Sequence, residues 1–118
     1  RKEMMEFNRD WSLIETIHVQ LNGNMLELKS DNGTLLDENF IKENLPNLEI
    51  RFDGDLLEPW MRVVMLLTSI CLLFPVKKVV IHKGVTEEMK QMILEEKSSF
   101  PSVKTDYVFC KGCNRCDE

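Results

Sequence analysis

The sequence predicts a small α/β domain whose mostly parallel sheet is built from repeated β-α units behind an N-terminal β-hairpin. The first observation is the apolar stretch 56–81, in which a helix runs directly into a strand. A buried helix followed by a buried strand is half of a βαβ unit, and such units build largely parallel sheets. The second observation is an Asn-Gly pair between alternating apolar residues, and the third is a succession of three helix–strand pairs.

Composition limits what kind of protein this is. With 118 residues, 43% of them hydrophobic, the chain is long and apolar enough for one domain with its own core. Its net charge of −5 argues against a nucleic-acid surface, because phosphate binding depends on clustered Lys and Arg. The organisation we predict is a lead-in segment at 1–12, a single domain at 13–109 and a cysteine-rich tail at 110–118.

The beginning of the chain bears on the compartment. Its first residue is Arg1 rather than an initiator methionine, and no secretory apolar region follows. We therefore expect a segment of a larger intracellular protein, cytoplasmic or nuclear, that contacts neither membrane nor nucleic acid.

The hairpin is the clearest local signal. Apolar residues alternate over 14–21 and again over 25–30, and Asn22-Gly23 lies between the two runs. Both residues of that pair tolerate positive φ, which a two-residue type I′ turn requires. We expect two antiparallel strands at these positions.

The next unit is a helix followed by a strand. Residues 35–45 have an apolar stripe, with Asp37 as the expected N-cap and Glu38 near the positive end of the helix. Pro46 ends the helix. Alternation over 48–52 then predicts a strand, and Asp53-Gly54 turns the chain toward the central helix.

The central helix is predicted to be buried on nearly every side. Residues 63–74 include no charged side chain, and a helix that is apolar all round needs a buried environment. Asp55 and Glu58 have the spacing of a capping box, and Pro59 is tolerated in a first turn. Pro75 ends the helix, because the residue before a proline is pushed out of the α region.

A membrane span is the alternative interpretation of this stretch, and it fails on length. About 20 apolar residues are needed to cross the hydrocarbon core of a bilayer. Arg62 and Lys77 bracket a shorter run.

The last third of the domain repeats the helix–strand order. Residues 76–81 form a predicted strand, with Val79, Val80 and Ile81 at its buried centre. Thr86 is the expected cap of a third helix, whose inner face includes Met89, Met92 and Ile93. A final strand is predicted at 103–109.

A weak repeat joins the strand entries at an interval of 31 residues. The apolar positions and the turn residue recur in three copies: Ile14, Ile17, Val19 and Asn22; Leu45, Leu48, Ile50 and Asp53; Val76, Val79, Ile81 and Gly84. This pattern resembles the leucine-rich-repeat family, and the segment LPNLEIRFD is the nearest match. The resemblance implies a curved parallel sheet that binds another protein. The alternative is that any chain of alternating strands and helices repeats apolar residues at such an interval.

The tail holds the most pointed chemical feature. Three cysteines, Cys110, Cys113 and Cys116, have the spacing C-x2-C-x2-C, which allows their thiolates to bind one metal ion together. A closed zinc site needs a fourth ligand, and the candidates are Cys71, His82, Asp117 or a group outside this chain. His82 reaches the tail only if the last strand lies beside its own. A reduced tail, or disulfide and redox use, are the alternatives.

Other polar residues offer no catalytic set. His18 and His82 occupy polar positions of predicted strands, which favours solvated strand faces over catalysis. A cluster of carboxylates at the start of the central helix is explained by capping, with a divalent-cation site as the alternative: Asp53, Asp55 and Glu58. No glycine-rich phosphate loop is present.

The function we predict from these features is a non-enzymatic protein–protein interaction module, possibly adaptor-like, whose partner is another protein. The alternative is a zinc-binding or thiol redox domain that acts through Cys110, Cys113 and Cys116. No other cofactor is expected, and an ordinary hydrolase or transferase comes third.

Overall fold

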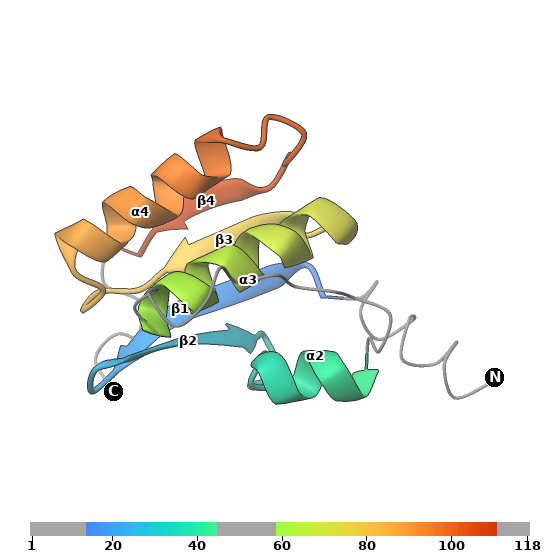
Figure 1. The fold of residues 1–118 in the computed structure, drawn as a ribbon, viewed down its shortest axis with the longest axis horizontal. Coiled ribbons are helices and arrows are strands. Elements are labelled where there is room, and N and C mark those ends of the chain that lie inside the picture. Colours follow the sequence, from blue (N-terminus) through green and yellow to red (C-terminus); the bar gives the residue numbers. More distant parts are fainter. Residues whose placement is uncertain (1–13, 45–58, 111–118) are drawn as a thin grey trace, which may run out of the picture.

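The computed structural model describes residues 14–44 and 59–110 (Figure 1). Within these ranges the chain forms four strands and three helices. In chain order they are β1 (Thr16–Asn22), β2 (Met25–Ser30), α2 (Glu38–Asn44), α3 (Pro59–Leu73), β3 (Lys78–Ile81), α4 (Glu87–Ser98) and β4 (Asp106–Phe109).

The four strands form one mixed sheet in the order β2-β1-β3-β4. β1 and β2 pair antiparallel as the predicted hairpin, whereas β1–β3 and β3–β4 are parallel. The α/β class and the N-terminal hairpin are therefore confirmed. The mostly parallel sheet is confirmed only in part, because one of the three strand pairs is antiparallel.

The hairpin turn differs from the predicted one. Asn22 pairs with Met25, so the two central residues are Gly23 and Asn24 rather than Asn22 and Gly23. Gly23 has φ 63°, and no residue other than glycine has positive φ in the described ranges. Positive φ at the first central residue alone is typical of a type II′ turn, which needs glycine there. The Asn-Gly signal located the hairpin but not the register of its turn.

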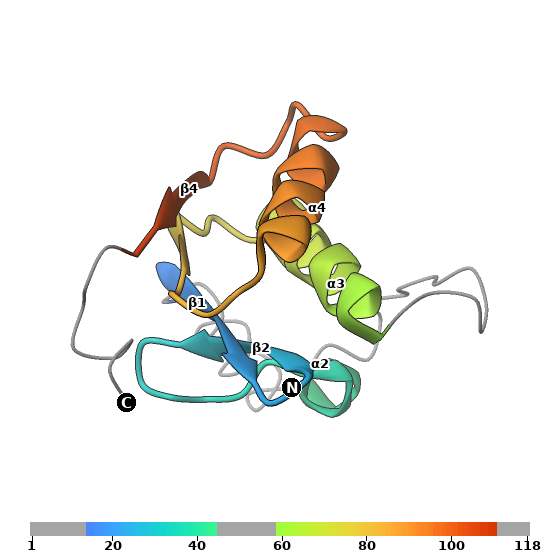
Figure 2. The same cartoon turned by 90° about the vertical axis from the view of Figure 1, so that its left-hand side faces the viewer.

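Helices α3 and α4 cover one face of the sheet (Figure 2). Alternate residues of the two central strands point into this layer and are at most 1% exposed: Ile17, Val19, Val79 and Ile81. They belong to the same core cluster as Leu67 and Ile70 of α3 and Ile93 of α4. The core therefore lies between the sheet and the two long helices.

The central helix is less enclosed than predicted. The described part of the helix runs from Pro59 to Leu73, and the expected cap at Asp55 lies outside the described residues. Thr68 donates to the Val64 carbonyl at 3.2 Å, which satisfies a buried hydroxyl within the helix. Leu72 and Leu73 are 40% and 55% exposed, so the expectation of burial on nearly every side is wrong for the last turn.

Two predicted caps are confirmed by hydrogen bonds. The amide of Phe40 donates to the Asp37 carboxylate at 2.8 Å at the start of α2. The amide of Met89 donates to the Thr86 hydroxyl at 3.2 Å at the start of α4. These bonds satisfy amides that have no partner within the helix.

Other predicted elements are shortened or lie elsewhere. β3 and β4 are shorter than the predicted strands 76–81 and 103–109. The predicted strand 48–52 and the capping box of Asp55 and Glu58 lie outside the described residues. β1 pairs directly with β3, so the first and third copies of the 31-residue pattern are neighbours. Because the middle copy lies outside the described residues, the leucine-rich-repeat resemblance stays a prediction.

Candidate functional site

The sheet face opposite α3 and α4 holds two histidines in contact. His18 lies on β1 between the core residues Ile17 and Val19, so strand alternation turns its ring to this face. His82 follows directly after β3, and its amide donates to the Val19 carbonyl at 2.9 Å. The two rings meet at 2.9 Å between Nδ1 of His18 and Nε2 of His82.

Asp31 extends this pair into a chain of three side chains. Its Oδ1 lies 2.6 Å from Nε2 of His18. A carboxylate only accepts hydrogen bonds, so Nε2 of His18 carries a proton. When both rings are neutral, Nδ1 of His18 then accepts from Nε2–H of His82. That tautomer of His82 keeps its lone pair on Nδ1.

The predicted solvated positions of the two histidines are wrong. His18 is 8% exposed and His82 is 3% exposed. Buried polar groups require hydrogen-bond partners, and each ring supplies one to the other. Asp31, with 62% of its side chain exposed, connects the buried pair to solvent. A hollow of about 320 Å³ opens beside this end, lined in part by Gln20, Lys29 and Asp31.

Cys110 lies beside His82, at the other end of the hydrogen-bonded row Asp31–His18–His82. β4 runs parallel to β3, and their register places Val80 opposite Val108 and Ile81 opposite Phe109. The Cys110 amide donates to the Ile81 carbonyl at 2.9 Å, which continues that register by one residue. His82 and Cys110 are thus the next opposed positions, and alternation from Val80 and Val108 assigns both to the histidine face. The condition for His82 to reach the tail is met.

Cys71 lies on the other side of the sheet. It is a 6% exposed residue of α3 in the hydrophobic core, as predicted for a packed thiol. The Tyr107 hydroxyl donates to its Sγ at 3.8 Å. Burial raises the pKa of the Cys71 thiol, and burial also raises the pKa of Tyr107. The sheet separates Cys71 from Cys110, which removes Cys71 from the candidate fourth ligands.

Several predicted site residues cannot be placed. Cys113, Cys116 and Asp117 of the tail lie outside the described residues, and so do Asp53, Asp55 and Glu58. Within 14–44 and 59–110, no group of three or more His, Cys, Asp or Glu side chains is arranged to hold a metal ion. A metal site at the tail therefore stays a prediction.

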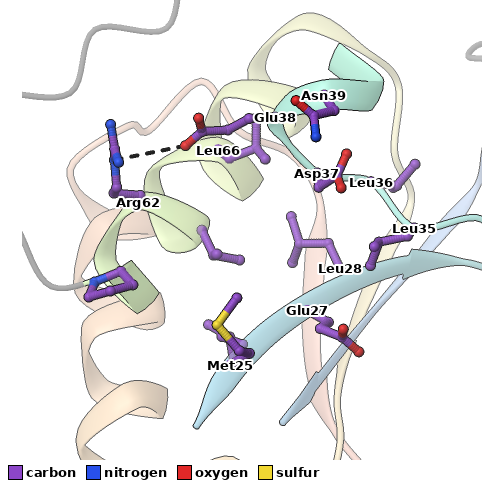
Figure 3. Close-up of a pocket in the computed structure, with 13 residues that line it drawn as sticks. Met25, Glu27, Leu28, Leu35, Leu36, Asp37, Glu38, Asn39, Arg62 and Leu66 are labelled. Carbon is purple, nitrogen blue, oxygen red and sulfur yellow. Dashed lines mark ion pairs between the residues drawn. The ribbon is translucent and has the colours of Figure 1, made fainter. Parts of the chain in front are cut away.

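A second candidate site is an apolar groove between β2, α2 and α3 (Figure 3). Its volume is about 340 Å³. Met25 and Leu35 line it and are 60% and 40% exposed, while Leu28, Leu36 and Leu66 form buried walls. Such a site offers room for one or two apolar side chains of a ligand.

The rim of the groove is mainly acidic. Two carboxylates line it, those of Asp37 and Glu38, whereas strand alternation turns the Glu27 carboxylate to the other face of β2, where it lies 3.9 Å from Lys29. Arg62 faces them from α3, and its Nε lies 3.8 Å from Glu38 (Figure 3).

Comparisons with known proteins add no assignment. No family model, no curated protein and no solved structure matches this chain. In the described ranges, no helix has both the length and the apolar character needed to cross a bilayer.

Sequence reasoning missed the hydrogen-bonded chain and the groove for different reasons. The contacts of His18 join residues 13 and 64 positions away in the chain, and no local spacing encodes them. A partial signal existed for the groove, since Met25, the first residue of β2, and Leu35 beyond its end are large apolar residues outside the alternation of Leu26 and Leu28.

Proposed function

We propose that this domain is a non-enzymatic protein-interaction module that binds a short peptide segment of a partner protein in the groove between β2, α2 and α3. The observation that carries the proposal is an apolar groove with exposed Met25 and Leu35 at its mouth. Exposed apolar side chains grouped around a concave site are typical of binding surfaces.

The charge of the rim specifies the partner. Asp37 and Glu38 line the groove, and Arg62 is paired with Glu38. The whole chain also has a net charge of −5. Complementary charge favours encounter with a cationic segment and disfavours an acidic one. The expected ligand is an apolar anchor residue flanked by Lys or Arg.

The edge of the sheet supports an interaction role in a second way. The outer side of β2 is partly closed by a bridge between Lys29 and Leu35. β4 is the opposite edge, and among the described residues no strand pairs with its outer side. An edge strand of this kind can make a second, separate contact by pairing with a partner strand.

The proposal is tested by selecting binders to the 118-residue chain from a display library of short random peptides. We expect enriched peptides to combine a large apolar residue with neighbouring Lys or Arg. A fluorescent copy of the best peptide is then titrated against Met25→Lys, which puts a like charge at the mouth of the groove. Each 1.4 kcal/mol of lost binding energy is tenfold in affinity, and we expect a loss of about tenfold or more.

Leu94→Lys is the matched control. Leu94 is a 38% exposed apolar residue of α4, away from the groove. The same change of charge there should leave peptide affinity within about twofold, which is less than 0.5 kcal/mol. Peptides without basic residues, or equal losses in the two variants, would contradict the proposal.

A further inference from the structure

We propose that the peptide groove continues past Met25 into a second apolar hollow, and that this hollow takes an aromatic side chain of the same peptide. The inference rests on the proposed function and deepens it. It adds a second anchor to the partner segment, besides the apolar residue and the basic residues that the groove itself favours.

The second hollow lies at the hairpin end of the domain. Figure 1 shows the turn between β1 and β2 at the same end as the first described turn of α3 and the first turn of α4. The space that they enclose has a volume of about 420 Å³, against about 340 Å³ for the groove. Three half-buried apolar side chains line it, those of Leu21, Trp60 and Met89.

The groove and the second hollow adjoin. Met25 and Pro59 line both of them, so the two spaces share a wall. Met25 is 60% exposed, and its side chain points toward α3 (Figure 3). A methionine side chain has three rotatable bonds, which lets Met25 adapt to a ligand on either side of it. A peptide that fills the groove and continues past Met25 therefore enters the second hollow.

The lining of the second hollow favours an aromatic ring. Trp60 can stack with such a ring or meet its edge, and tryptophan is enriched among the residues that dominate binding energy. Met25 and Met89 add two thioether sulfurs, which make favourable contacts with aromatic rings. Among the described residues of this lining none is charged. Without a carboxylate to pair with, a Lys or Arg side chain is the poorer occupant.

The shared wall limits the spacing of the two anchors. In an extended peptide, alternate side chains lie on one side about 7 Å apart. In a helical peptide, side chains three or four residues apart are separated by about 5–6 Å. Two neighbouring hollows therefore select anchors about two to four residues apart in either conformation. The partner segment combines an apolar anchor, nearby Lys or Arg, and an aromatic residue at this spacing.

The first test reads the sequences of the peptides selected against the unaltered 118-residue chain. We expect most enriched peptides to carry an aromatic residue about two to four positions from the apolar anchor. Peptides with one apolar anchor, basic residues and no recurrent aromatic residue would overturn the second hollow as a subsite. That outcome would leave the groove and the proposed function in place.

The second test blocks each space separately. Asn24→Trp places a large side chain on the exposed wall of the second hollow, and Leu35→Lys places a charge at the mouth of the groove. Both variants are titrated with the best peptide and with its alanine copy, in which the aromatic anchor is replaced. Asn24→Trp should weaken the intact peptide about tenfold and leave the alanine copy within about twofold. Leu35→Lys should weaken both peptides.

Asn22→Trp is the matched control. Asn22 is exposed at the other side of the same turn, outside the described lining of the second hollow. The same substitution there should leave both peptides within about twofold. Equal losses in Asn22→Trp and Asn24→Trp, or an equal loss of the two peptides in Asn24→Trp, would overturn the second subsite. Unchanged binding in Leu35→Lys would instead contradict the groove and, with it, the proposed function.

A measurement on the unaltered chain does not depend on any variant remaining folded. The indole N–H of Trp60 gives its own signal in nitrogen–proton correlation NMR spectra. The intact peptide should shift this signal together with the amide signal of Leu35. The alanine copy should shift the Leu35 signal but not the indole signal. A Trp60 signal that stays in place when the chain is saturated with the intact peptide would overturn the proposal.

Discussion

The two faces of the sheet are built from adjacent residues and have opposite chemistry. Ile17 and Val19 point toward α3 and α4, whereas His18 between them points the other way and bonds to His82. Both faces are buried at these positions, since all three β1 residues are at most 8% exposed. One face is stabilised by packing and the other by hydrogen bonds. Burial alone therefore does not identify the hydrophobic core of this domain.

The largest expected effect lies on the helix-covered face. Ile70 of α3 is fully buried in the core cluster. Ile70→Ala should lower the free energy of unfolding by about 2–5 kcal/mol, because it removes buried methyl groups and leaves a cavity. Urea denaturation followed by circular dichroism measures the change.

Leu73→Ala is the control within the same helix. Leu73 is 55% exposed, so its truncation should change the free energy of unfolding by less than about 0.5 kcal/mol. A similar cost at both positions would mean that the last turn of α3 is covered in solution and that the helix is as enclosed as its sequence suggested.

The next effect lies on the histidine face. His18→Leu introduces an apolar side chain of similar size and leaves the buried His82 ring without its hydrogen-bond partner on β1. The expected loss is about 1–3 kcal/mol, the cost of an unsatisfied buried polar group. The measurement is made with a chelator present, so that metal binding makes no contribution.

Gln20→Leu is compared under the same conditions. Gln20 is two residues further along β1 on the same face, and it is only half-buried. Its replacement should cost less than about 0.5 kcal/mol. If His18→Leu were neutral or stabilising, the histidine face would behave as an ordinary apolar surface and the two faces would not differ in kind.

Whether a feature of the two faces could be predicted from the sequence depends on how far apart the interacting residues are along the chain. Capping by Asp37 and Thr86 was predictable because each bond joins residues three positions apart. The alternation of β1 also identified Ile17 and Val19 as inward residues. The burial of His18 was not predictable, since it depends on which strand lies beside β1 and on the turn that carries Asp31.

The metal site predicted for the tail shows the same division. The spacing of Cys110, Cys113 and Cys116 is local and visible in the sequence. Selecting His82 over Cys71 as the fourth candidate required the order β3–β4 and the face on which α3 packs. No property of either residue in the sequence decides between them, because sheet order follows from non-local pairing.

The buried Cys71 thiol on the helix-covered face should make the free energy of unfolding depend on pH. Burial holds its pKa above the ordinary value of 9.0, so the unfolded chain loses this proton at lower pH than the folded domain. The contribution of the protonated Cys71 thiol to the free energy of unfolding is therefore fully present below pH 9.0, and it is lost as pH rises above that value. The slope contributed by one such proton is at most about 1.4 kcal/mol per pH unit.

Cys71→Ala should remove that contribution to the slope between pH 9.0 and 10.0, below the ordinary value of Tyr107. Chemical denaturation of both proteins across this range, with chelator and reductant present, measures the difference. Identical slopes would show that the thiol is as accessible to hydroxide in the folded domain as in the unfolded chain. That result would contradict its place in the core.

The smallest effect is expected at the exposed end of the histidine chain. Asp31→Asn keeps an oxygen that can accept from His18 but removes the negative charge. Because 62% of the Asp31 side chain is exposed, we expect a loss below about 1 kcal/mol.

Glu15→Gln is the comparison, since the Glu15–Lys77 pair is exposed at both ends and joins two residues at 3.3 Å. High salt should abolish the cost of Glu15→Gln, because exposed pairs are screened. The cost of Asp31→Asn should persist in high salt, since the His18 end of its hydrogen bond is buried. Equal screening of the two substitutions would mean that the His18–Asp31 bond is an ordinary surface contact. The histidine face would then be held by the His18–His82 pair alone.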